Sequence, residues 1–442
     1  MTFYSYFTKV RGRVRNNHSY ILFPYFYIFR QSFVDIILQK GRDKCRMKNK
    51  ISSKKQNKYV KEDNAMIIMN LQIDNFCAFK NFHMNMAYPK KIVNSYIPNE
   101  YLKGRDNFRY KKVNILMGGN ATGKTSIGKI LMEICYFIKQ KEAFSLVKKI
   151  ADVNKEASIS MDFICKSFIM YRVDVKVIPG KDEMEEPIIL ACKRETTIEE
   201  KDRYETCAKK IDDIPIVYSD NYKKELDGIE SIGWMFTYPS DMSDNKVRFR
   251  EDETYLKVLD YTLRSLDPSI MGVDQSSEVE NTYIIHLNSR DLLVQDGEVI
   301  RKSILSSGTK AGIDIASLIF AIYKGECGFY YCDEKFSYIH SELEKAFLTI
   351  MIYGLRENEQ LFFTTHNSDI LDLPLPKHAF TFLKKEIFEN EQLIKCVYVS
   401  DYLKRSTDSV RRAVDNDLFS ASPNIELVYK IAEIEEFVKE ED

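Results

Sequence analysis

The pattern of apolar and polar positions changes near residue 66, and beyond it alternating strands and helices are predicted. Val113–Met117 is a short, mostly apolar run of the kind that forms a buried parallel strand. After a glycine-containing loop, apolar residues recur at helical spacing, at Ile127, Ile130, Leu131, Ile134 and Ile138. Strand, loop and helix in this order predict one unit of an α/β fold.

Alternation of apolar and polar residues predicts further, antiparallel strands. Such alternation occurs around Leu71 and Ile73, over 159–163 and over 171–177, and short strands are also expected at Tyr283–Leu287 and at Leu292–Val294. Cys165–Ser167 separates the second and third of these runs and suits a hairpin with one buried face. Asp296-Gly297 follows the last run and predicts a tight hairpin turn before Glu298–Ile300.

Helical spacing predicts a second group of elements. A leucine stripe ends near Pro268 and consists of Leu256, Leu259, Leu263 and Leu266. Residues 180–255 are charged and weakly periodic, so we expect an inserted, mostly helical region there. Near the end of the chain, Ser406–Ala413 and Asn424–Val438 read as helices. The second has one apolar face, which would pack against another subunit or against its own head.

Composition and charge narrow the class of protein. The 442 residues are 44% hydrophobic and 29% charged, which allows a large core and two or three domains. Net charge is zero, but residues 1–65 hold 15 Lys and Arg against 4 acidic residues, which leaves 50 and 61 for the remainder. An acidic body argues against a broad surface that coats nucleic acid, although a local basic groove stays open. The nine cysteines form no C-x-x-C pair, so we expect reduced thiols rather than disulfides or a zinc site.

The first 65 residues lack the pattern of a packed domain. They are aromatic-rich to about Phe33 and then rich in Lys, Arg, Asn and Gln. A basic arm for nucleic acid or an anionic membrane is one interpretation. A flexible extension, or a start assigned upstream of Met66 or Met69, is the simpler one. The apolar run Tyr20–Phe29 is about half a membrane span and no signal-peptide cleavage site follows it, so we expect a cytoplasmic protein without a membrane partner.

Residues 118–126 carry the first candidate chemistry. Gly118-Gly119-Asn120-Ala121-Thr122-Gly123-Lys124-Thr125 fits the phosphate-loop pattern G-x-x-x-x-G-K-[ST], and Ser126 follows it. Glycines let successive backbone N–H groups turn towards one point, where a helix N-terminus adds partial positive charge. Lys124 would reach the β- and γ-phosphates of ATP, and the Thr125 hydroxyl would hold Mg²⁺. The alternative is an ordinary glycine-rich turn, which the flanking strand and helix disfavour.

Three later motifs complete a candidate site. Leu305-Ser306-Ser307-Gly308-Thr309 precedes a helical run, and small residues before a helix form an anion-binding N-terminus. A buried strand runs into Asp333 and Glu334, where the first carboxylate would support Mg²⁺ and the second would polarise the attacking water. Another apolar strand leads to His366, which would touch a γ-phosphate. Alone, each motif is more simply a turn, an acidic helix cap or a satisfied polar residue.

In this order the four motifs resemble the ABC-type ATPase head of SMC proteins, RecF and the OLD-family ATPases. The opening Ile73–Phe79 resembles the first strand and turn of those heads. Asp333–His340 is similar to the acidic motif of stand-alone bacterial AAA-family, ABC-like ATPases, many of which belong to anti-phage abortive-infection systems. The resemblance covers residues 66–385. It implies an α/β P-loop NTPase with a mixed sheet, antiparallel β hairpins and an inserted helical region.

The resemblance also implies a role for each motif. Residues Gly118–Ser126 would bind ATP, Thr125 and Asp333 Mg²⁺, Glu334 would be the catalytic base, and His366 would sense the γ-phosphate. Ser306, Ser307 and Gly308 would contact ATP held by another subunit, so that ATP links a homodimer or higher homo-oligomer. Ser337–His340 would cross that interface. Ser307 stands where the better-known signature has glycine, and no glutamine loop is assigned because Gln140 lies too close to the phosphate loop.

These observations predict five segments and several functions. The segments are a basic extension (1–65), a head lobe with the phosphate loop (66–179), a mostly helical insertion (180–282), a second head lobe (283–385) and a helical tail (386–442). We expect an ATP-hydrolysing switch or sensor of an anti-phage defence system that acts with a separate effector, a nuclease or toxin. The alternative is a RecF- or SMC-like ATPase of DNA repair or chromosome maintenance, with nucleic acid left open as a partner.

Other functions of such heads are disfavoured. No long heptad arm is visible in 180–255, which argues against an SMC-like arm. A transporter subunit would have a more compact insert than the 182 positions between Lys124 and Ser306. An OLD-type nuclease would need a strand-and-acid-cluster pattern that the 76 residues after His366 do not show.

Overall fold

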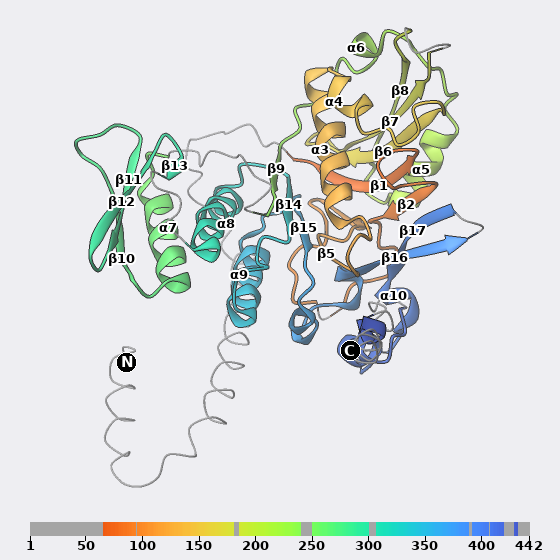
Figure 1. The fold of residues 1–442 in the computed structure, drawn as a ribbon. Coiled ribbons are helices and arrows are strands. Elements are labelled where there is room, and N and C mark those ends of the chain that lie inside the picture. Colours follow the sequence, from red (N-terminus) through yellow and green to blue (C-terminus); the bar gives the residue numbers. More distant parts are fainter. Residues whose placement is uncertain are drawn as a thin grey trace, which may run out of the picture. The chain divides into compact units, whose positions relative to one another are not determined.

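The computed structural model describes residues 65–93, 95–180, 185–239, 250–299, 306–388, 391–405, 407–419 and 428–431. The expectations for residues 1–64, for Leu305 and for most of Asn424–Val438 lie outside these ranges. The described part forms two large β-sheets, a helix buried between them and a separate small sheet (Figure 1). None of its helices is long and apolar enough to cross a membrane.

The first large sheet has six strands in the order β17-β16-β5-β15-β14-β9. Their bounds are β5 Val113–Met117, β9 Trp234–Thr237, β14 Phe329–Asp333, β15 Gln360–Thr364, β16 Phe380–Phe388 and β17 Glu391–Tyr398. All neighbours are parallel except β17, which pairs antiparallel with β16 at one edge. Strands β5, β14 and β15 are buried along their whole length, as their apolar runs predict. Because parallel strands end at one edge of a sheet, the loops after these three strands lie at the same edge.

The second large sheet is antiparallel, in the order β2-β1-β6-β7-β8. Its strands are β1 Ile67–Asp74, β2 Phe82–Asn85, β6 Ala157–Ile164, β7 Ile169–Ile178 and β8 Ile188–Thr197. The hairpin predicted over 159–177 is β6 and β7 and is confirmed. The buried side chain of Gln360 ties the two sheets, because its Oε1 accepts from the N–H of Ile68 at 2.9 Å and its Nε2 donates to the Ile68 carbonyl at 3.1 Å.

Helix α3 (Lys124–Gln140) lies between the two sheets (Figure 1). Its apolar residues share one buried cluster with residues of both sheets. Ten of its seventeen residues are buried, as expected of a helix covered by two layers. Gly128 allows its close approach to β14, since a Cβ there would lie 2.6 Å from Cε1 of Tyr331. The Tyr331 hydroxyl also donates to the Lys124 carbonyl at 2.6 Å, which fixes the start of α3 on the sheet.

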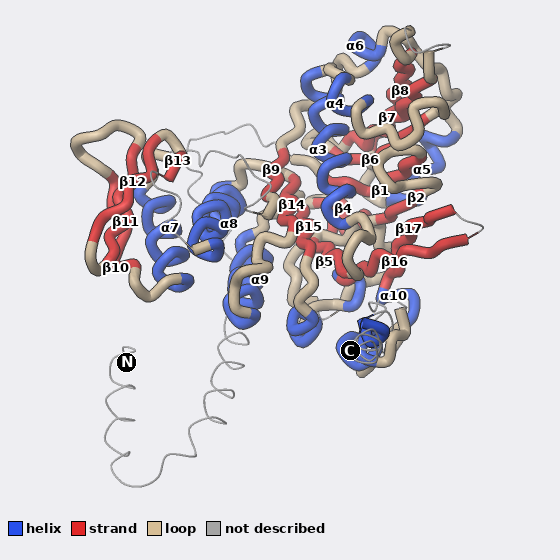
Figure 2. Tube along the Cα trace, viewed as in Figure 1, coloured by secondary structure: helices blue, strands red, loops and turns tan. Residues whose placement is uncertain are grey.

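A separate small core forms around α7 (Glu253–Leu266), α8 (Ser307–Lys324) and a sheet in the order β10-β11-β12-β13 (Figure 2). The strands are β10 Ile270–Gln275, β11 Thr282–Leu287, β12 Arg290–Gln295 and β13 Glu298–Val299. The predicted leucine stripe lies on α7 and is confirmed. The predicted turn is confirmed as well, because Asp296 and Gly297 have φ values of 47° and 81°, as a two-residue hairpin turn requires.

The other elements are short apart from α9. They are β3 Tyr101–Leu102, β4 Arg105–Arg109, α4 Phe144–Val147, α5 Tyr204–Asp212, α6 Tyr222–Glu225, α9 Ser341–Gly354, η2 Ser368–Asp372, η3 Lys377–Ala379, α10 Val399–Tyr402 and α11 Val410–Asp415. Strands β3 and β4 pair with each other as a two-stranded sheet. Helix α9 follows β14 along the chain and leads to β15, so it connects two neighbouring parallel strands.

Two segments differ from their predicted secondary structure. Residues 180–282, expected to be mostly helical, contain α5, α6 and α7 but also strands β8, β9 and β10. Strand β8 was not predicted, because apolar and polar residues alternate only weakly in an edge strand that has few buried positions. The tail 386–442, expected to be helical, begins with the end of β16 and with β17. This hairpin was missed for the same reason, since β17 is also an edge strand with only one fully buried residue.

The contact between Gly128 and Tyr331 gives a stability prediction. Gly128→Ala should lower the free energy of unfolding by about 1–3 kcal/mol, because the added methyl group overpacks the ring of Tyr331. The change would otherwise favour a helix by about 1 kcal/mol. Denaturant unfolding measures the difference. The same change combined with Tyr331→Leu should cost less, and an unchanged or higher stability of the single variant would contradict the packing.

Candidate functional site

The loop between β5 and α3 closes around the ammonium group of Lys124. Nζ of Lys124 donates to the carbonyls of Gly118 at 2.9 Å and Gly119 at 3.1 Å. Gly118 and Gly123 have φ values of 142° and 97°, and a Cβ at Gly118 would lie 2.5 Å from the Leu383 carbonyl oxygen. Glycine is therefore required at Gly118 for both space and conformation. Because α3 begins at Lys124, its first N–H groups lack helical partners and are available to an anion.

Asp333 and Glu334 stand at the end of β14, beside the loop. Glu334 has a φ of 42°, which is uncommon for a residue other than glycine. Its N–H donates to Oγ1 of Thr364 at 2.9 Å, which holds this backbone to the end of β15. Oε1 of Glu334 lies 3.4 Å from Nζ of Lys124 and 2.8 Å from Nε2 of His366. One carboxylate oxygen therefore contacts both the loop lysine and the histidine.

The two neighbouring carboxyl groups have opposite pKa shifts. Burial raises the pKa of Asp333, and the hydroxyls of Thr125 and Thr364 oppose this only in part. Burial would also raise the pKa of Glu334, but the hydrogen bond and charge of His366, with the charge of Lys124, outweigh it and lower the pKa. Burial lowers the pKa of Lys124, and Glu334 works against that shift. Such divergence fits different roles for two adjacent acids, with Glu334 kept ionised.

The Asp333 carboxyl group has the properties of a cation ligand. Its Oδ1 accepts from the Thr364 hydroxyl at 2.7 Å. Its Oδ2 is buried and has no partner at hydrogen-bond geometry among the described residues, although the Thr125 hydroxyl is near enough to favour the ionised form. Mg²⁺ takes oxygen ligands and commonly uses one or two carboxylates together with substrate phosphates and water. Asp333 and Thr125 therefore fit this ion.

Ser306, Ser307 and Gly308 form the start of α8 and are not brought to the phosphate loop. Ser306 caps the helix by accepting from the N–H of Thr309 at 3.1 Å. Both serines are exposed. A Cβ at Gly308 would lie 3.2 Å from the Tyr338 carbonyl, so this turn packs against the loop 337–340. Within the described chain, no hydrogen bond or ion pair joins residues 306–308 to residues 118–126.

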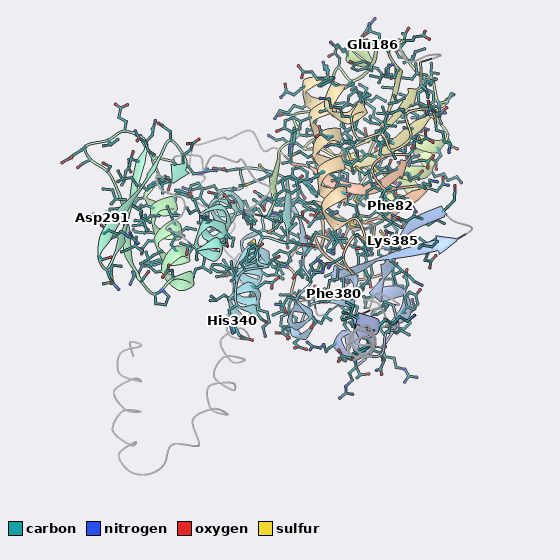
Figure 3. All side chains as sticks on the ribbon, viewed as in Figure 1. Phe82, Glu186, Asp291, His340, Phe380 and Lys385 are labelled. Atoms are coloured by element: carbon teal, nitrogen blue, oxygen red, sulfur yellow. The ribbon has the colours of Figure 1, made fainter. Side chains whose placement is uncertain are left out.

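The loop 337–340 leads from Glu334 to α9. Oγ of Ser337 donates to the Glu334 carbonyl at 2.7 Å. His340 is exposed at the N-terminal end of α9, where its Nδ1 accepts from the N–H of Glu342 at 3.2 Å (Figure 3). The loop expected to cross a subunit interface is thus accessible and begins three residues after the candidate base.

Several polar residues that hold the site were missed by sequence reasoning. Lys335 is buried, donates to the Tyr238 carbonyl at 2.7 Å and forms an ion pair with Asp314 of α8. Glu344 of α9 is also buried and contacts the residues on both sides of His366. The only sequence signal was the polar run after the apolar strand β15. From the sequence alone, a charged residue that is buried cannot be distinguished from one that is exposed.

Comparison with known proteins finds similarity at the level of fold alone. No protein-family model matches the chain, and no curated protein matches its sequence. Similar solved structures include an SMC head bound to the C-terminal winged-helix domain of ScpA, with 15% identity, a TM-score of 0.44 and coverage of 76% of this chain and 99% of that one. The SMC head with an extended coiled coil, bound to the ScpA C-terminal domain from Pyrococcus furiosus, has 12% identity, a TM-score of 0.43 and coverage of 77% and 98%. RecF with ATP has 10% identity, a TM-score of 0.37 and coverage of 77% and 100%.

The contact between His366 and Glu334 predicts a measurable pKa change. His366→Ala should raise the pKa of Glu334, because it removes a hydrogen bond and a charge that favour the carboxylate while burial stays. Carboxyl ¹³C NMR of glutamate-labelled protein follows this titration, and Glu334→Gln assigns the signal. His340→Ala, outside the cluster, should leave the titration unchanged. An unchanged pKa in His366→Ala would show that the two side chains do not interact in solution.

Proposed function

We propose that this chain binds ATP with Mg²⁺ at residues Gly118–Ser126 and hydrolyses it with Glu334 as the general base. The supporting observation is the meeting of Lys124, Glu334 and His366 at the edge where β5, β14 and β15 end. A buried lysine in a glycine loop, next to two acids that end a buried strand, is an arrangement that positions a triphosphate and a water.

In this proposal each residue contacts a defined part of the substrate. Lys124 exchanges its bonds to the loop carbonyls for the β- and γ-phosphate oxygens, and N–H groups of the loop and of α3 donate to the phosphates. Thr125 and Asp333 hold Mg²⁺, which neutralises phosphate charge. Glu334 accepts a proton from water while the water oxygen bonds to the γ-phosphorus and the bond to the ADP oxygen breaks. His366 orients Glu334 and contacts the γ-phosphate.

We further propose that ATP joins two copies of the chain, as a homodimer or a higher oligomer. Ser306–Gly308 supports this, because it is the accessible N-terminus of an eighteen-residue helix and makes no described bond to its own phosphate loop. The N-terminus of α8 in one copy would then contact the γ-phosphate held by the other. The neighbouring loop 337–340 would lie at the same interface, next to Gly308.

For the biological role we propose an ATP-controlled switch of anti-phage defence that acts on a separate effector. This role is supported by the resemblance of Asp333–His340 to the acidic motif of such ATPases. A RecF- or SMC-like role in DNA maintenance is the second candidate and rests on the same head. Stimulation of ATP hydrolysis by double-stranded DNA would favour the second role over the first.

Variants of the base and the lysine test hydrolysis. Glu334→Gln should still bind ATP but hydrolyse it at least about a hundredfold more slowly, as loss of a general base typically does. Lys124→Ala should lose ATP binding, whereas Lys129→Ala on the same helix should not. Phosphate release and equilibrium binding of a fluorescent ATP analogue measure the two steps. Full hydrolysis by Glu334→Gln would exclude it as the base.

Light scattering tests the association. Glu334→Gln should accumulate as an ATP-dependent dimer, because ATP is bound and not cleaved. Adding Ser306→Arg should abolish the dimer without abolishing ATP binding, whereas Ser409→Arg, at the exposed N-cap serine of α11, should leave it intact. A crosslink between cysteines placed near Lys124 and near Ser306 of different subunits checks for a constitutive oligomer. Absence of that crosslink with ATP bound would rule out the shared site.

A further inference from the structure

One buried carboxylate holds the backbone on both sides of His366. Glu344 lies in the first turns of α9 with only 3% of its surface exposed. One of its oxygens accepts from Oγ1 of Thr365 at 2.6 Å, and the other accepts from Nδ2 of Asn367 at 2.7 Å. Thr365 and Asn367 directly precede and follow His366. Both oxygens of Glu344 are therefore used to hold one tripeptide.

The tripeptide lies outside regular secondary structure, and one backbone bond, from the N–H of Thr365 to the Leu116 carbonyl at 3.3 Å, joins its first residue to β5. Residues 365–367 lie between the end of β15 and the 3₁₀ helix that begins at Ser368. A further hydrogen bond, from the N–H of Asn367 to Oγ1 of Thr365 at 2.9 Å, closes the turn. The His366 side chain is 39% exposed and contacts Glu334 at 2.8 Å, so packing does little to hold its imidazole ring. The bonds to Glu344 fix the backbone from which this ring projects.

Burying a carboxylate carries a free-energy penalty, because the charged group loses its hydration. Burial raises the pKa of Glu344, and the bonds from Thr365 and Asn367 offset this only in part. An apolar side chain of similar size would fill the space without that cost. What the carboxylate adds is two acceptors at fixed positions, each matched to a donor of the His366 turn. The arrangement is thus one that orients a loop.

We propose that Glu344 is a positioning residue that holds the turn Thr365–Asn367 so that His366 reaches Glu334. This inference rests on the proposed function, because it assigns Glu344 a role in hydrolysis through His366. It predicts that loss of Glu344 lowers kcat and leaves ATP binding unchanged, since among the described residues the side chain of Glu344 bonds to Thr365 and Asn367 and not to the phosphate loop. It also predicts that the effect disappears when His366 is absent.

The experiment compares kcat and KM for ATP in single and double variants of the full chain. Glu344→Leu should lower kcat by about 10- to 100-fold, as expected for a displaced group in a site, with KM unchanged. Glu344→Gln should keep most of the activity, because its amide can accept from Asn367 and donate to Thr365. As a control, Thr349→Val removes a different buried polar group of α9, a hydroxyl that donates to the Lys345 carbonyl of the same helix, and should have no effect. In a His366→Ala background, Glu344→Leu should cause no further loss.

The outcomes separate this inference from the proposed function. A full additional loss in the His366→Ala background, or a KM change without a kcat change, would overturn the role of Glu344. So would a wild-type rate of His366→Ala itself, while the variants of Lys124 and Glu334 would still test ATP hydrolysis independently. If Glu344→Leu does not fold, Thr365→Val removes one of the two bonds of Glu344 from the other side with little change of shape. A lower kcat is then expected, again with no further loss in the His366→Ala background.

Discussion

A buried ammonium group sets the arrangement of the parallel sheet around the phosphate loop. Lys124 is 4% exposed, and a buried charge without partners costs several kcal/mol. Its partners are two carbonyls of its own loop and the carboxylate of Glu334. The two carbonyls belong to the same loop as Lys124, whereas Glu334 follows β14 and lies 210 positions further along the chain. The ends of β5 and β14 must therefore lie within the length of two side chains.

The strand between them supplies the remaining contacts. β15 separates β5 from β14 in the sheet, and it ends in Thr364. The Thr364 hydroxyl donates to Asp333 and accepts from the N–H of Glu334, so it contacts both acids. A positive φ at Glu334 costs of order 1–3 kcal/mol and persists only where the surroundings hold it. The bond from Thr364 is part of that support, and the strained residue is the one that contacts Lys124 and His366.

The parts of the site that the sequence predicted are those set by one-dimensional patterns. Mostly apolar runs predicted β5, β14 and β15, and the polar residues after them lie together because parallel strands end at the same edge. Asp333, Glu334 and His366 were predicted from these strand ends and Lys124 from the phosphate-loop pattern, and the structure brings Lys124, Glu334 and His366 into contact. The order of the strands could not be predicted, and neither could β8 or β17, whose exposed edge positions weaken the alternation. Lys335 and Glu344 were missed because their burial depends on α8 and α9 folding over them, which no local pattern records.

These two missed residues connect the acidic strand end to both neighbouring helices. Lys335 directly follows Glu334 and pairs with Asp314 on α8, the helix that starts at Ser306–Gly308. Glu344 belongs to α9, which starts where the loop 337–340 ends. Breaking a buried ion pair typically costs 3–5 kcal/mol, so the Lys335–Asp314 connection resists separation. Lys335 and Glu344 therefore join α8 and α9 to the backbone beside Glu334 and His366, and both contacts are made by charged side chains that are themselves buried.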